Sequence, residues 1–506
     1  TKSADDYAQS SVVKEDADNK FRGSDQKREN IVKEESPTPV TTQEQVFSER
    51  SGPLTIDFTD MGGNIKSIYD EKHQYAFPVK NYLNIQGFEN KPFLVEKISD
   101  KKIVFSYSDQ EWQITKEYVL NRNHNVDVVI KIKNLSNEAK GFKHPVEVFT
   151  VDLSTLDKNA QQADQALFEI SLKTKDKIIR KENSSNFNEK WNKEENQNIE
   201  WFGFRDRYFA TLVKTSQDVN KYTMQAVSKQ KLTIGTELPQ KSIAPSESAS
   251  FAFTLYAGPQ RIDFLKEAGK GFEKILVFSS WGWLDAIAKA IYFTLGFLHK
   301  IIPVWGLCII LISVIVYGGM YPLTMKSMMS MKKMQALQPK INALREKYKN
   351  NPEKLNQETV LLYKTQQVNP LGGCLPMLLQ MPIFIGLYQV LWRSVYFRGE
   401  KFLWIQDLSM PDRLFKFPFT IPFLGEYFNI LPLIMMAVMF VQQKLNLKTT
   451  AGSSPEQQAQ QKMMAIFFPI LLGFIFYNFS SGLNLYFVVF YIFSALSQWH
   501  VTRETE

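Results

Sequence analysis

Hydrophobic and polar residues alternate, one by one, through much of residues 46–258. The alternation is clearest in three places, which are Leu54, Ile56 and Phe58, residues 103–107 and residues 126–132. A period of two puts apolar side chains on one face of a half-buried strand. Turn residues separate the strands, so we expect antiparallel strands in a large β-sandwich. A helical insertion near residues 155–200 is compatible with the pattern.

After residue 300 the alternation gives way to long apolar runs. Five runs are near the roughly 20 residues that span a hydrocarbon core. They are residues 301–321, 373–395, 428–444, 463–481 and 484–499. The sequence therefore predicts an α-helical polytopic membrane bundle of five spans.

The second apolar run contains polar and helix-breaking residues that a soluble core rarely accepts. Pro376 and Pro382 flank Gln380 within residues 369–388. A proline frees the backbone carbonyl one turn earlier, and in lipid that carbonyl needs another partner. Gln380 therefore either satisfies such a carbonyl locally or forms part of a polar path.

An amphipathic pattern precedes the first apolar run. Its apolar residues recur at helical spacing and are Trp281, Trp283, Leu284, Ile287, Ile291, Leu295 and Leu298. Asp285 and Lys289 lie elsewhere on the helical wheel. We expect an interfacial helix, with its tryptophans at headgroup level and its apolar stripe toward the acyl chains. The alternative is a helix that packs on the β domain.

The charges set the expected topology. The net charge is +8 and the mean hydropathy is −0.24, but these averages conceal a polar first half and an apolar second half. Nine Lys and Arg and three Glu lie between the first two apolar runs, whereas residues 396–427 carry four basic and four acidic residues. Because basic loops stay in the cytoplasm, we place residues 322–370 and the C terminus in the cytoplasm. The β domain then lies outside, in the periplasm of a cell with two membranes.

Composition excludes several classes of site and partner. The basic residues are not interleaved with aromatic residues as in nucleic-acid-binding modules, so no DNA partner is expected. Cys308 and Cys374 both lie in or beside apolar runs, which argues against a disulfide framework, a metal site or a reactive thiol. No Gly-x-x-x-x-Gly-Lys motif for ATP is present, and we expect no cofactor.

The basic segment at residues 326–368 also shows helical periodicity. Its apolar positions are Met334, Leu337, Ile341, Leu344 and Tyr348, followed after a break at residues 350–352 by Leu355, Thr359 and Leu362. We expect a helical hairpin whose apolar stripe joins its own two helices and serves only secondarily as a docking face. Its basic residues include Lys332, Lys333, Lys340 and Arg345. They suit anionic lipid or ribosomal RNA, although positive-inside bias alone explains them.

Residues 1–45 are rich in charged and small polar residues and too poor in apolar residues to bury a core. We expect a disordered tether there. Because a tether holds a domain to something, we also expect a sixth membrane span ahead of Thr1.

Two other function classes remain open from the residues alone. Polar residues in apolar runs also occur in channels and transporters, but the sequence shows no paired discontinuous helices or ring of like charges. His73, His124 and His144 suggest an acid/base site of a carbohydrate-active enzyme on the β domain. Lone histidines are nevertheless more often ordinary core or surface residues, because an acid/base site needs convergent groups.

Six stretches of the membrane half stand out together. They are Met-Tyr-Pro-Leu-Thr at 320–324, Met-Gln-Ala-Leu-Gln-Pro-Lys at 334–340, Asn-Pro-Leu-Gly-Gly-Cys at 369–374, Gln-Met-Pro-Ile-Phe at 380–384, Trp-Ile-Gln-Asp-Leu-Ser at 404–409 and Ser-Gly-Leu-Asn-Leu-Tyr at 481–486. In these stretches and in their order, the membrane half resembles the YidC membrane protein insertase family. The external region resembles, in position and strand character, the periplasmic supersandwich domain of Gram-negative members.

The resemblance implies an insertase and foldase without a catalytic site. Members insert nascent membrane proteins into the inner membrane, alone or with the Sec translocon, through a hydrophilic groove. The ribosome and membrane lipids are further implied partners. The implied domains are a tether (1–45), a periplasmic domain (46–265), a linker with the interfacial helix (266–300), the insertase domain (301–500) and a tail (501–506).

The resemblance also implies residues of the groove. Ser313 and Tyr317 lie one turn apart, where the family has a hydroxyl residue and an arginine credited with attracting acidic substrate segments. Tyr317 replaces that arginine. Arg393 is the candidate substitute, although its place near the outer end of its helix favours the membrane interface. Gln380 and Tyr486 match family residues, Phe487 takes the place of a second aromatic residue, and Asn478 and Asn484 add polarity nearby. Helix packing is the plainer alternative for all of them.

Overall fold

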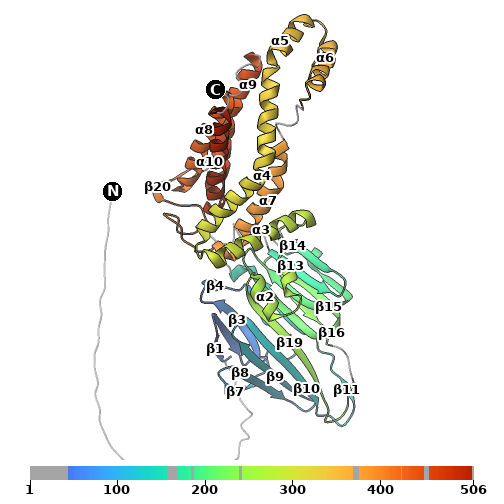
Figure 1. Ribbon diagram of the computed structural model, residues 1–506. Helices are drawn as coiled ribbons and strands as arrows, with labels where there is room; N and C mark the ends of the chain where they lie inside the picture. The colour runs from blue at the N-terminus through green and yellow to red at the C-terminus, as the bar shows by residue number, and fades with distance from the viewer. Residues whose placement is uncertain are drawn as a thin grey trace, which may run out of the picture. The chain divides into compact units, whose positions relative to one another are not determined.

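The computed structural model describes residues 44–155, 168–183, 187–238, 242–368, 375–422, 424–448 and 455–503. Strands dominate up to Pro259, and helices follow (Figure 1). The expected tether lies outside the described residues except for Glu44 and Gln45. The motif at 369–374, with Cys374, and the last three residues of the chain also lie outside them.

The first part of the chain forms a sheet-rich domain. Its strands are β1 (Val46–Ser51), β2 (Leu54–Thr59), β3 (Asn64–Asp70), β4 (Tyr75–Ala76), β5 (Val79–Lys80), β6 (Asn84–Ile85), β7 (Leu94–Ser99), β8 (Lys102–Ser108), β9 (Trp112–Asn121), β10 (Asn125–Asn134), β11 (Lys140–Gly141), β12 (Val146–Asp152), β13 (Phe168–Thr174), β14 (Ile178–Asn183), β15 (Lys193–Arg205), β16 (Phe209–Ser228), β17 (Lys231–Thr236), β18 (Ser242–Ile243) and β19 (Ser248–Pro259). The three strands predicted from alternation are confirmed as β2, β8 and β10.

Two antiparallel sheets share one apolar core. The smaller sheet has the order β1-β2-β3-β4, and the larger follows β14-β13-β15-β16-β19-β10-β9-β8-β7 with four strands off this path. Alternate residues of β9 are buried, as its pattern predicts. Phe58 of the smaller sheet packs against Phe105 and Tyr118 of the larger one, with ring centroids 5.9 and 5.3 Å apart. These aromatic contacts hold the sheets face to face.

The helical insertion expected near residues 155–200 is not found in the parts of that region that the structure describes. Residues 168–174, 178–183 and 193–200 belong to β13, β14 and β15, and single 3₁₀ turns lie at Leu153–Thr155 and Glu189–Trp191. All seven residues of β13 are buried in the larger sheet. Its apolar residues Phe168, Ile170 and Leu172 alternate with polar ones, which is typical of a strand and not of a helix.

The second part of the chain is helical, apart from a small hairpin. The helices are α2 (Ile262–Ala268), α3 (Gly282–Ile301), α4 (Trp305–Ala336), α5 (Gln338–Lys347), α6 (Pro352–Thr365), α7 (Leu375–Arg393), α8 (Leu431–Lys448), α9 (Pro455–Ile475) and α10 (Ser481–Arg503), with 3₁₀ turns η4 (Phe272–Ile275), η6 (Val395–Phe397) and η7 (Phe476–Asn478). The hairpin consists of β20 (Phe415–Ile421) and β21 (Gly425–Phe428).

Each of the five predicted apolar runs is mainly helical where the structure describes it, although the run at 428–444 begins at the last residue of β21. Among the described residues, two stretches are long and apolar enough to cross a membrane, Trp305–Met334 of α4 and Ser481–His500 of α10. Shorter apolar stretches occupy α8 and the region of α9. The bundle is therefore established as helical and apolar, whereas the count of five spans stays a prediction.

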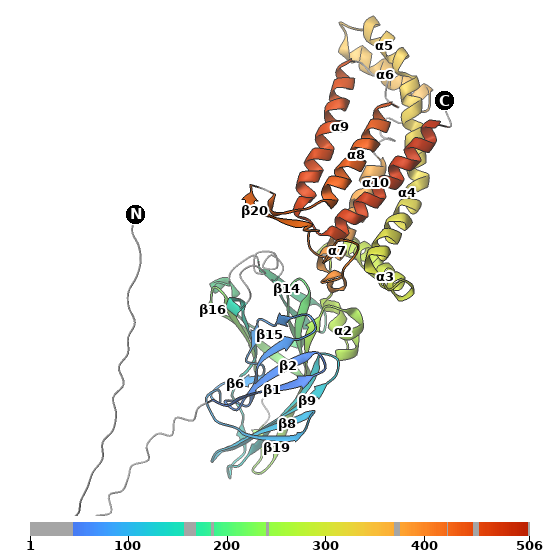
Figure 2. The ribbon, with the colours of Figure 1, turned by 90° about the vertical axis from the view of Figure 1, so that its left-hand side faces the viewer.

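Helix α10 lies at the centre of the bundle and packs against α4, α7 and α8, while α9 packs against α8 (Figure 2). The core between the helices contains Cys308, Leu387, Met435 and Leu483. On α9 large apolar side chains face outward, with Phe467 at 54% and Phe474 at 52% exposed. A continuous outward apolar face of this kind suits lipid contact.

The amphipathic helix predicted at residues 281–300 is confirmed as α3, but its apolar stripe packs against other helices and does not face lipid. Ala288, Ile291 and Leu295 are buried in the core shared with α4 and α7, so they pack on protein rather than on acyl chains. Trp281 and Trp283 are 65% and 54% exposed. The tryptophans remain available to a membrane interface, and the buried stripe fixes the helix to the bundle.

The basic segment forms the expected helical hairpin, with one difference in its first helix. Met334 belongs to the end of α4, and the chain restarts as α5 at Gln338. Pro339 explains the restart, because proline cannot donate a helical hydrogen bond and is favoured in a first turn. The predicted break is confirmed, since the Asn351 side chain caps α6 by accepting from the backbone N–H of Lys354 at 3.1 Å.

Candidate functional site

Gln380 of α7 and Tyr486 of α10 meet inside the bundle. Gln380 Nε2 donates a hydrogen bond to the Tyr486 hydroxyl at 3.0 Å. Tyr486 is 0% exposed and Gln380 is half-buried. Of the two roles expected for Gln380, the structure shows a bond to another helix rather than to a backbone carbonyl freed by Pro382.

Tyr317 of α4 extends this contact to a third helix. Its ring lies 5.4 Å from that of Phe490, which stacks on Tyr486 at 5.9 Å. Within the described part of the chain, the Tyr317 hydroxyl makes no hydrogen bond of normal geometry, although Ser497 of α10 is close enough to interact with it electrostatically. Tyr317, Phe490, Tyr486 and Gln380 thus form a row that joins α4, α10 and α7, which we call the polar row.

Ser313 and Asn484 are buried beside this row, and each satisfies a backbone carbonyl. Ser313 Oγ donates to the Ile309 carbonyl of its own helix at 2.6 Å. Asn484 Nδ2 donates to the Phe476 carbonyl at 3.1 Å and so ties α10 to η7. Both contacts fit the packing role that polar residues commonly have in membrane helices.

The remaining two predicted residues lie apart from each other. Phe487 is half-buried, and its ring contacts those of Phe384 and Phe476 at 5.2 and 5.1 Å. It therefore borders the polar row on the α7 side. Asn478 is exposed at the end of η7 and is not part of the row.

Burial shows that the polar row is closed at Tyr317 and Tyr486, whereas Gln380 and Phe490 are half-buried. Ser313, Tyr317, Asn484 and Tyr486 are 0, 5, 1 and 0% exposed. A water-filled groove lined by these side chains therefore requires α4, α7 and α10 to separate. Polar groups at such a seam lower the cost of separation, because water can replace their hydrogen bonds.

Sequence reasoning missed a second polar contact on α10. Gln442 Nε2 of α8 donates to the Ser494 hydroxyl at 2.6 Å. Gln442 stands in the third apolar run and so carried the same signal as Gln380, namely an amide inside a hydrophobic stretch. Helix α10 thus makes one side-chain amide bond to α7 and another to α8.

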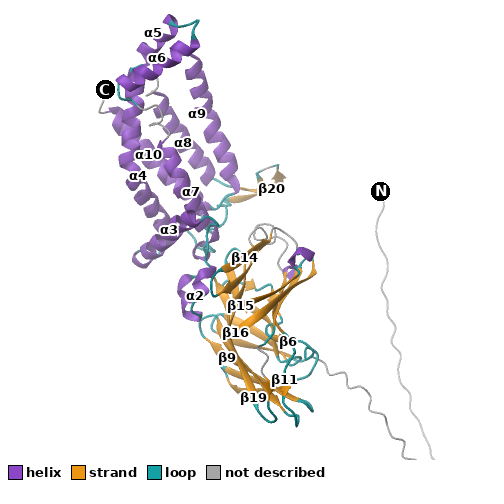
Figure 3. Ribbon diagram, turned by 90° about the vertical axis from the view of Figure 1, so that its right-hand side faces the viewer, coloured by secondary structure: helices purple, strands orange, loops and turns teal. Residues whose placement is uncertain are grey.

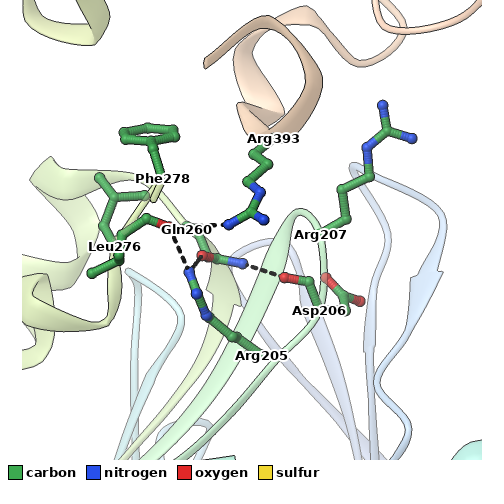
Figure 4. A pocket seen from close by; sticks show the side chains of 8 residues that line it. Arg205, Asp206, Arg207, Gln260, Leu276, Phe278 and Arg393 are labelled. Atoms are coloured by element: carbon green, nitrogen blue, oxygen red, sulfur yellow. Dashed lines mark hydrogen bonds between the residues drawn. The ribbon is translucent and has the colours of Figure 1, made fainter. Parts of the chain in front are cut away.

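Arg393 does not replace the missing positive charge. It lies at the last residue of α7, and its Nη1 donates to the Val277 carbonyl of the linker at 3.4 Å. Figure 4 shows its side chain reaching from α7 toward Gln260 and Arg205 of the β domain. The arginine therefore points away from the polar row.

The basic hairpin carries a cleft between its helices. The cleft has a volume of about 400 Å³, and its lining includes Lys340, Leu344, Lys347 and Leu362. Leu337 and Ile341 are buried against Leu362, so the predicted seam between the two helices forms at one end. Lys333 and Lys340 are exposed, whereas Lys332 and Arg345 are half-buried.

Two of the three histidines in the β domain converge on one carboxylate. His73 Nδ1 and His124 Nε2 lie 2.9 and 3.3 Å from Asp70 Oδ2. Burial would raise the pKa of Asp70, but hydrogen bonds with His124 and His73 outweigh it and hold the pKa well below its usual range. Asp70 is fully buried, so this cluster is closed to a sugar substrate. His144 is elsewhere, at 3.0 Å from the Gln86 carbonyl.

No metal centre accompanies these groups. Within the described residues, no three His, Cys, Asp or Glu side chains are arranged to hold a metal ion.

Family models match the two halves of the chain separately. Residues 88–294 match the YidC periplasmic domain, and residues 297–506 match the 60Kd inner membrane protein family. Together the matches cover the strands from β7 onward and the whole helical bundle.

Individual proteins give the same assignment. The membrane protein insertase YidC of Pelobacter propionicus is 31% identical over 496 residues, which are 92% of this chain and 88% of the relative. Other relatives of that name are up to 38% identical over about half of their own length. Among solved structures, an active YidC insertase with its first transmembrane domain resolved covers 90% of this chain and is itself covered to 95%, with 19% identity and a TM-score of 0.38.

A solved galactose mutarotase-like protein from Lactobacillus casei aligns along its own entire length with 42% of this chain, at 9% identity and a TM-score of 0.34. At TM-scores this low, neither solved structure supports a conclusion about this chain. The identity and coverage of the Pelobacter relative, by contrast, are decisive. This chain belongs to the YidC family of membrane protein insertases.

Proposed function

We propose that the chain inserts nascent membrane proteins into the inner membrane and that the polar row is where they enter the bilayer. The observation that carries the site is the bond between Gln380 and Tyr486, which places hydrogen-bonding groups between α7 and α10 inside an apolar bundle. Intramembrane polar groups are costly and are retained mainly where they serve a function.

The physical task explains why such a row helps. A polypeptide entering lipid must carry unsatisfied backbone groups through a medium where each costs several kcal/mol, on the order of 2–7. Helices that separate along the polar row would offer water and side-chain partners over part of that path. The apolar segment then leaves sideways into lipid by partition, without a catalytic step or an ATP site.

The proposal includes a topology that follows the charges. Helices α4, α7, α8, α9 and α10 would cross the membrane as five spans. The basic hairpin and the C terminus would be cytoplasmic, and the β domain, a supersandwich, periplasmic. The nine basic residues around the hairpin support this orientation.

The same basic residues suggest partners. We propose that Lys332, Lys333, Lys340 and Arg345 contact anionic lipid or a ribosome at the cytoplasmic entrance, and that the chain works alone or beside the Sec translocon. The exposed positions of Lys333 and Lys340 support such contacts.

Tyr317 distinguishes the proposed mechanism from one based on a fixed charge. A tyrosine holds water and hydrogen bonds but supplies no positive field. Arg393 lies with the linker, at the far end of α7. Insertion here would therefore depend on the polarity of the opened seam rather than on attraction of acidic segments.

Photocrosslinking tests the function and the site together. A photoreactive residue replaces Gln380 in the full chain, and a ribosome-bound single-span membrane protein is stalled during insertion. We expect a crosslink from position 380 to the nascent apolar segment. The matched control is position 131 in the β domain, where Lys131 is exposed.

The pattern of crosslinks decides the outcome. Crosslinks from position 380 that vanish when the substrate is released would support the proposal. Crosslinks from position 131 alone, or none to the apolar segment, would show that substrates do not enter at the polar row.

A further inference from the structure

The hairpin β20–β21 between α7 and α8 is a distinct element of the bundle. Its strands are antiparallel, with Phe415 opposite Phe428 and Lys416 opposite Tyr427. The rings of Phe415 and Phe428 stack with centroids 4.8 Å apart. Figures 2 and 3 both show β20 projecting sideways from the end of the bundle where α8 begins.

The base of the hairpin is fixed to the helices. Asp412 Oδ2 accepts hydrogen bonds from the backbone N–H groups of Ile430 and Leu431 at 2.9 and 3.1 Å, which caps the start of α8. The Tyr477 hydroxyl of η7 donates to the Tyr427 carbonyl and accepts from the Asn429 N–H, both at 3.1 Å. These bonds hold the base of the hairpin beside the start of α8 and beside η7, which follows the end of α9.

The body of the hairpin is apolar and exposed. Phe415 and Phe419 are 49% and 63% exposed, and Leu414 is 43% exposed. Two charged contacts lie among these rings. Lys416 Nζ pairs with Glu426 Oε2 at 3.0 Å, and the Arg413 guanidinium lies over the Tyr427 ring at 4.9 Å. Aromatic rings mixed with basic side chains are the composition of a membrane interface.

The neighbouring helix α9 indicates that lipid covers these rings. The outward face of α9 is apolar along its length, with Ile470 and Phe474 at 50% and 52% exposed, and it ends at η7, to which the hairpin is bonded. We propose that β20–β21 lies in the headgroup region of the outer leaflet and anchors the bundle there through Phe415 and Phe419. The proposal rests on α8 and α9 being embedded in lipid and not on insertase activity.

A dye at two neighbouring positions tests this placement. An environment-sensitive dye is attached at Phe419→Cys or at Thr420→Cys in the full chain carrying Cys374→Ser, and buried Cys308 is kept. Successive residues of a strand point to opposite faces, and both side chains are exposed, so Thr420 is the matched control. The labelled Cys374→Ser chain without a new cysteine corrects for residual labelling.

The chain is reconstituted in phosphatidylethanolamine–phosphatidylglycerol vesicles with a nitroxide lipid near the headgroups. We expect the dye at position 419 to be quenched by the nitroxide at least about twofold more than at position 420, and to be shielded from aqueous iodide. Equal iodide quenching at both positions would place the hairpin in water. Insensitivity of position 419 to both quenchers would show that protein covers it. Either result would overturn the proposal, and neither depends on insertion.

Discussion

The backbone carbonyl of Trp392 in the last turn of α7 accepts a hydrogen bond of 2.7 Å from Arg207 Nε, and the Arg207 guanidinium lies over the Trp392 ring at 4.9 Å. Arg207 stands in the turn between β15 and β16, so one side chain joins the β domain to the helix that carries Gln380. A cation at a helix C-terminus also interacts favourably with the helix dipole. Val395, just beyond α7, is buried in the apolar core of the β domain. The β domain therefore holds the outer end of α7.

Replacing Arg207 should loosen that end. Arg207 is 6% exposed, and loss of a hydrogen bond to a charged group costs about 1.5–3 kcal/mol. We expect Arg207→Ala to speed hydrogen exchange in the last turn of α7 by about tenfold or more. Arg207→Lys keeps the charge but loses the planar stacking on Trp392, so its exchange rate should lie between those of the wild-type and Arg207→Ala chains.

The control for this prediction is a surface arginine. Arg50 is 77% exposed and lies 3.8 Å from Glu71, and such pairs contribute about 0–1 kcal/mol. Arg50→Ala should leave exchange in α7 unchanged. Equal exchange in the Arg207→Ala and wild-type chains would mean that the β domain does not hold α7.

Lys116 should make the stability of the β domain rise with pH above neutrality. It is fully buried, and its Nζ donates to the Leu83 carbonyl at 3.0 Å and to the Asn64 side chain. Burial lowers the pKa of Lys116 to about 7. Between that value and the unfolded pKa of about 10.4 the unfolded chain binds more protons, so stability rises with pH, by up to about 1.4 kcal/mol per pH unit.

Urea unfolding of the full chain in detergent, followed by the circular dichroism of the strands, measures this slope at pH 7 and pH 9. Lys116→Met should remove it, whereas Lys131→Met, at an exposed position of β10, should not. A wild-type chain that is no more stable at pH 9 than at pH 7 would be inconsistent with a lowered pKa of Lys116.

Asp70 should make the stability of the β domain sensitive to acid. The pKa of its carboxylate is held well below the usual value despite burial, because His124 and His73 bond to it. Its contribution is therefore present above the unfolded pKa of about 3.9 and is lost as the pH falls toward the lower folded pKa. We expect Asp70→Asn to cost about 1–3 kcal/mol at pH 7 and to flatten acid unfolding below pH 4, both measured by urea unfolding. An unchanged acid midpoint would exclude this role.

The Gln380–Tyr486 bond should be measurable as a coupling energy. Gln380→Leu and Tyr486→Phe each remove one partner, and the double variant removes both. Polar pairs between membrane helices average about 0.6 kcal/mol, so we expect a coupling near that value in detergent unfolding. Additive effects of the two single variants would mean that the bond contributes nothing.

The sequence predicted elements that rest on local pattern. The strand at Leu54, Ile56 and Phe58 alternates because one face is buried, and the break before α6 follows from Asn351 and Pro352. By contrast, the helical insertion expected near residues 155–200 is not found where the structure describes that region, although Phe168, Ile170 and Leu172 of β13 alternate with polar residues as in a strand. The stripe of α3 showed which residues would be buried, but not that α4 and α7 would cover them.

The polar row was predicted only in part for a similar reason. Gln380 is predicted from the sequence because an amide in an apolar run is itself a signal, whereas Tyr317 and Tyr486 are implied by the resemblance to the insertase family. Contacts between distant residues carry no such signal, since Arg207 and Trp392 are 185 positions apart and His124 and Asp70 are 54 apart. Burial of Ser313 and Tyr486 likewise depends on how the helices pack and not on their own sequence.

Reconstitution tests the central claim most directly. The purified full chain is placed in liposomes, a short single-span protein with an acidic tail is added, and protease protection reports the translocated tail. We expect protection with the wild-type chain, little with empty liposomes, and a marked loss with Gln380→Leu combined with Tyr317→Phe at equal amounts of folded protein. Protection unchanged by the double variant would contradict entry at the polar row, and no protection with the wild-type chain would contradict insertion itself.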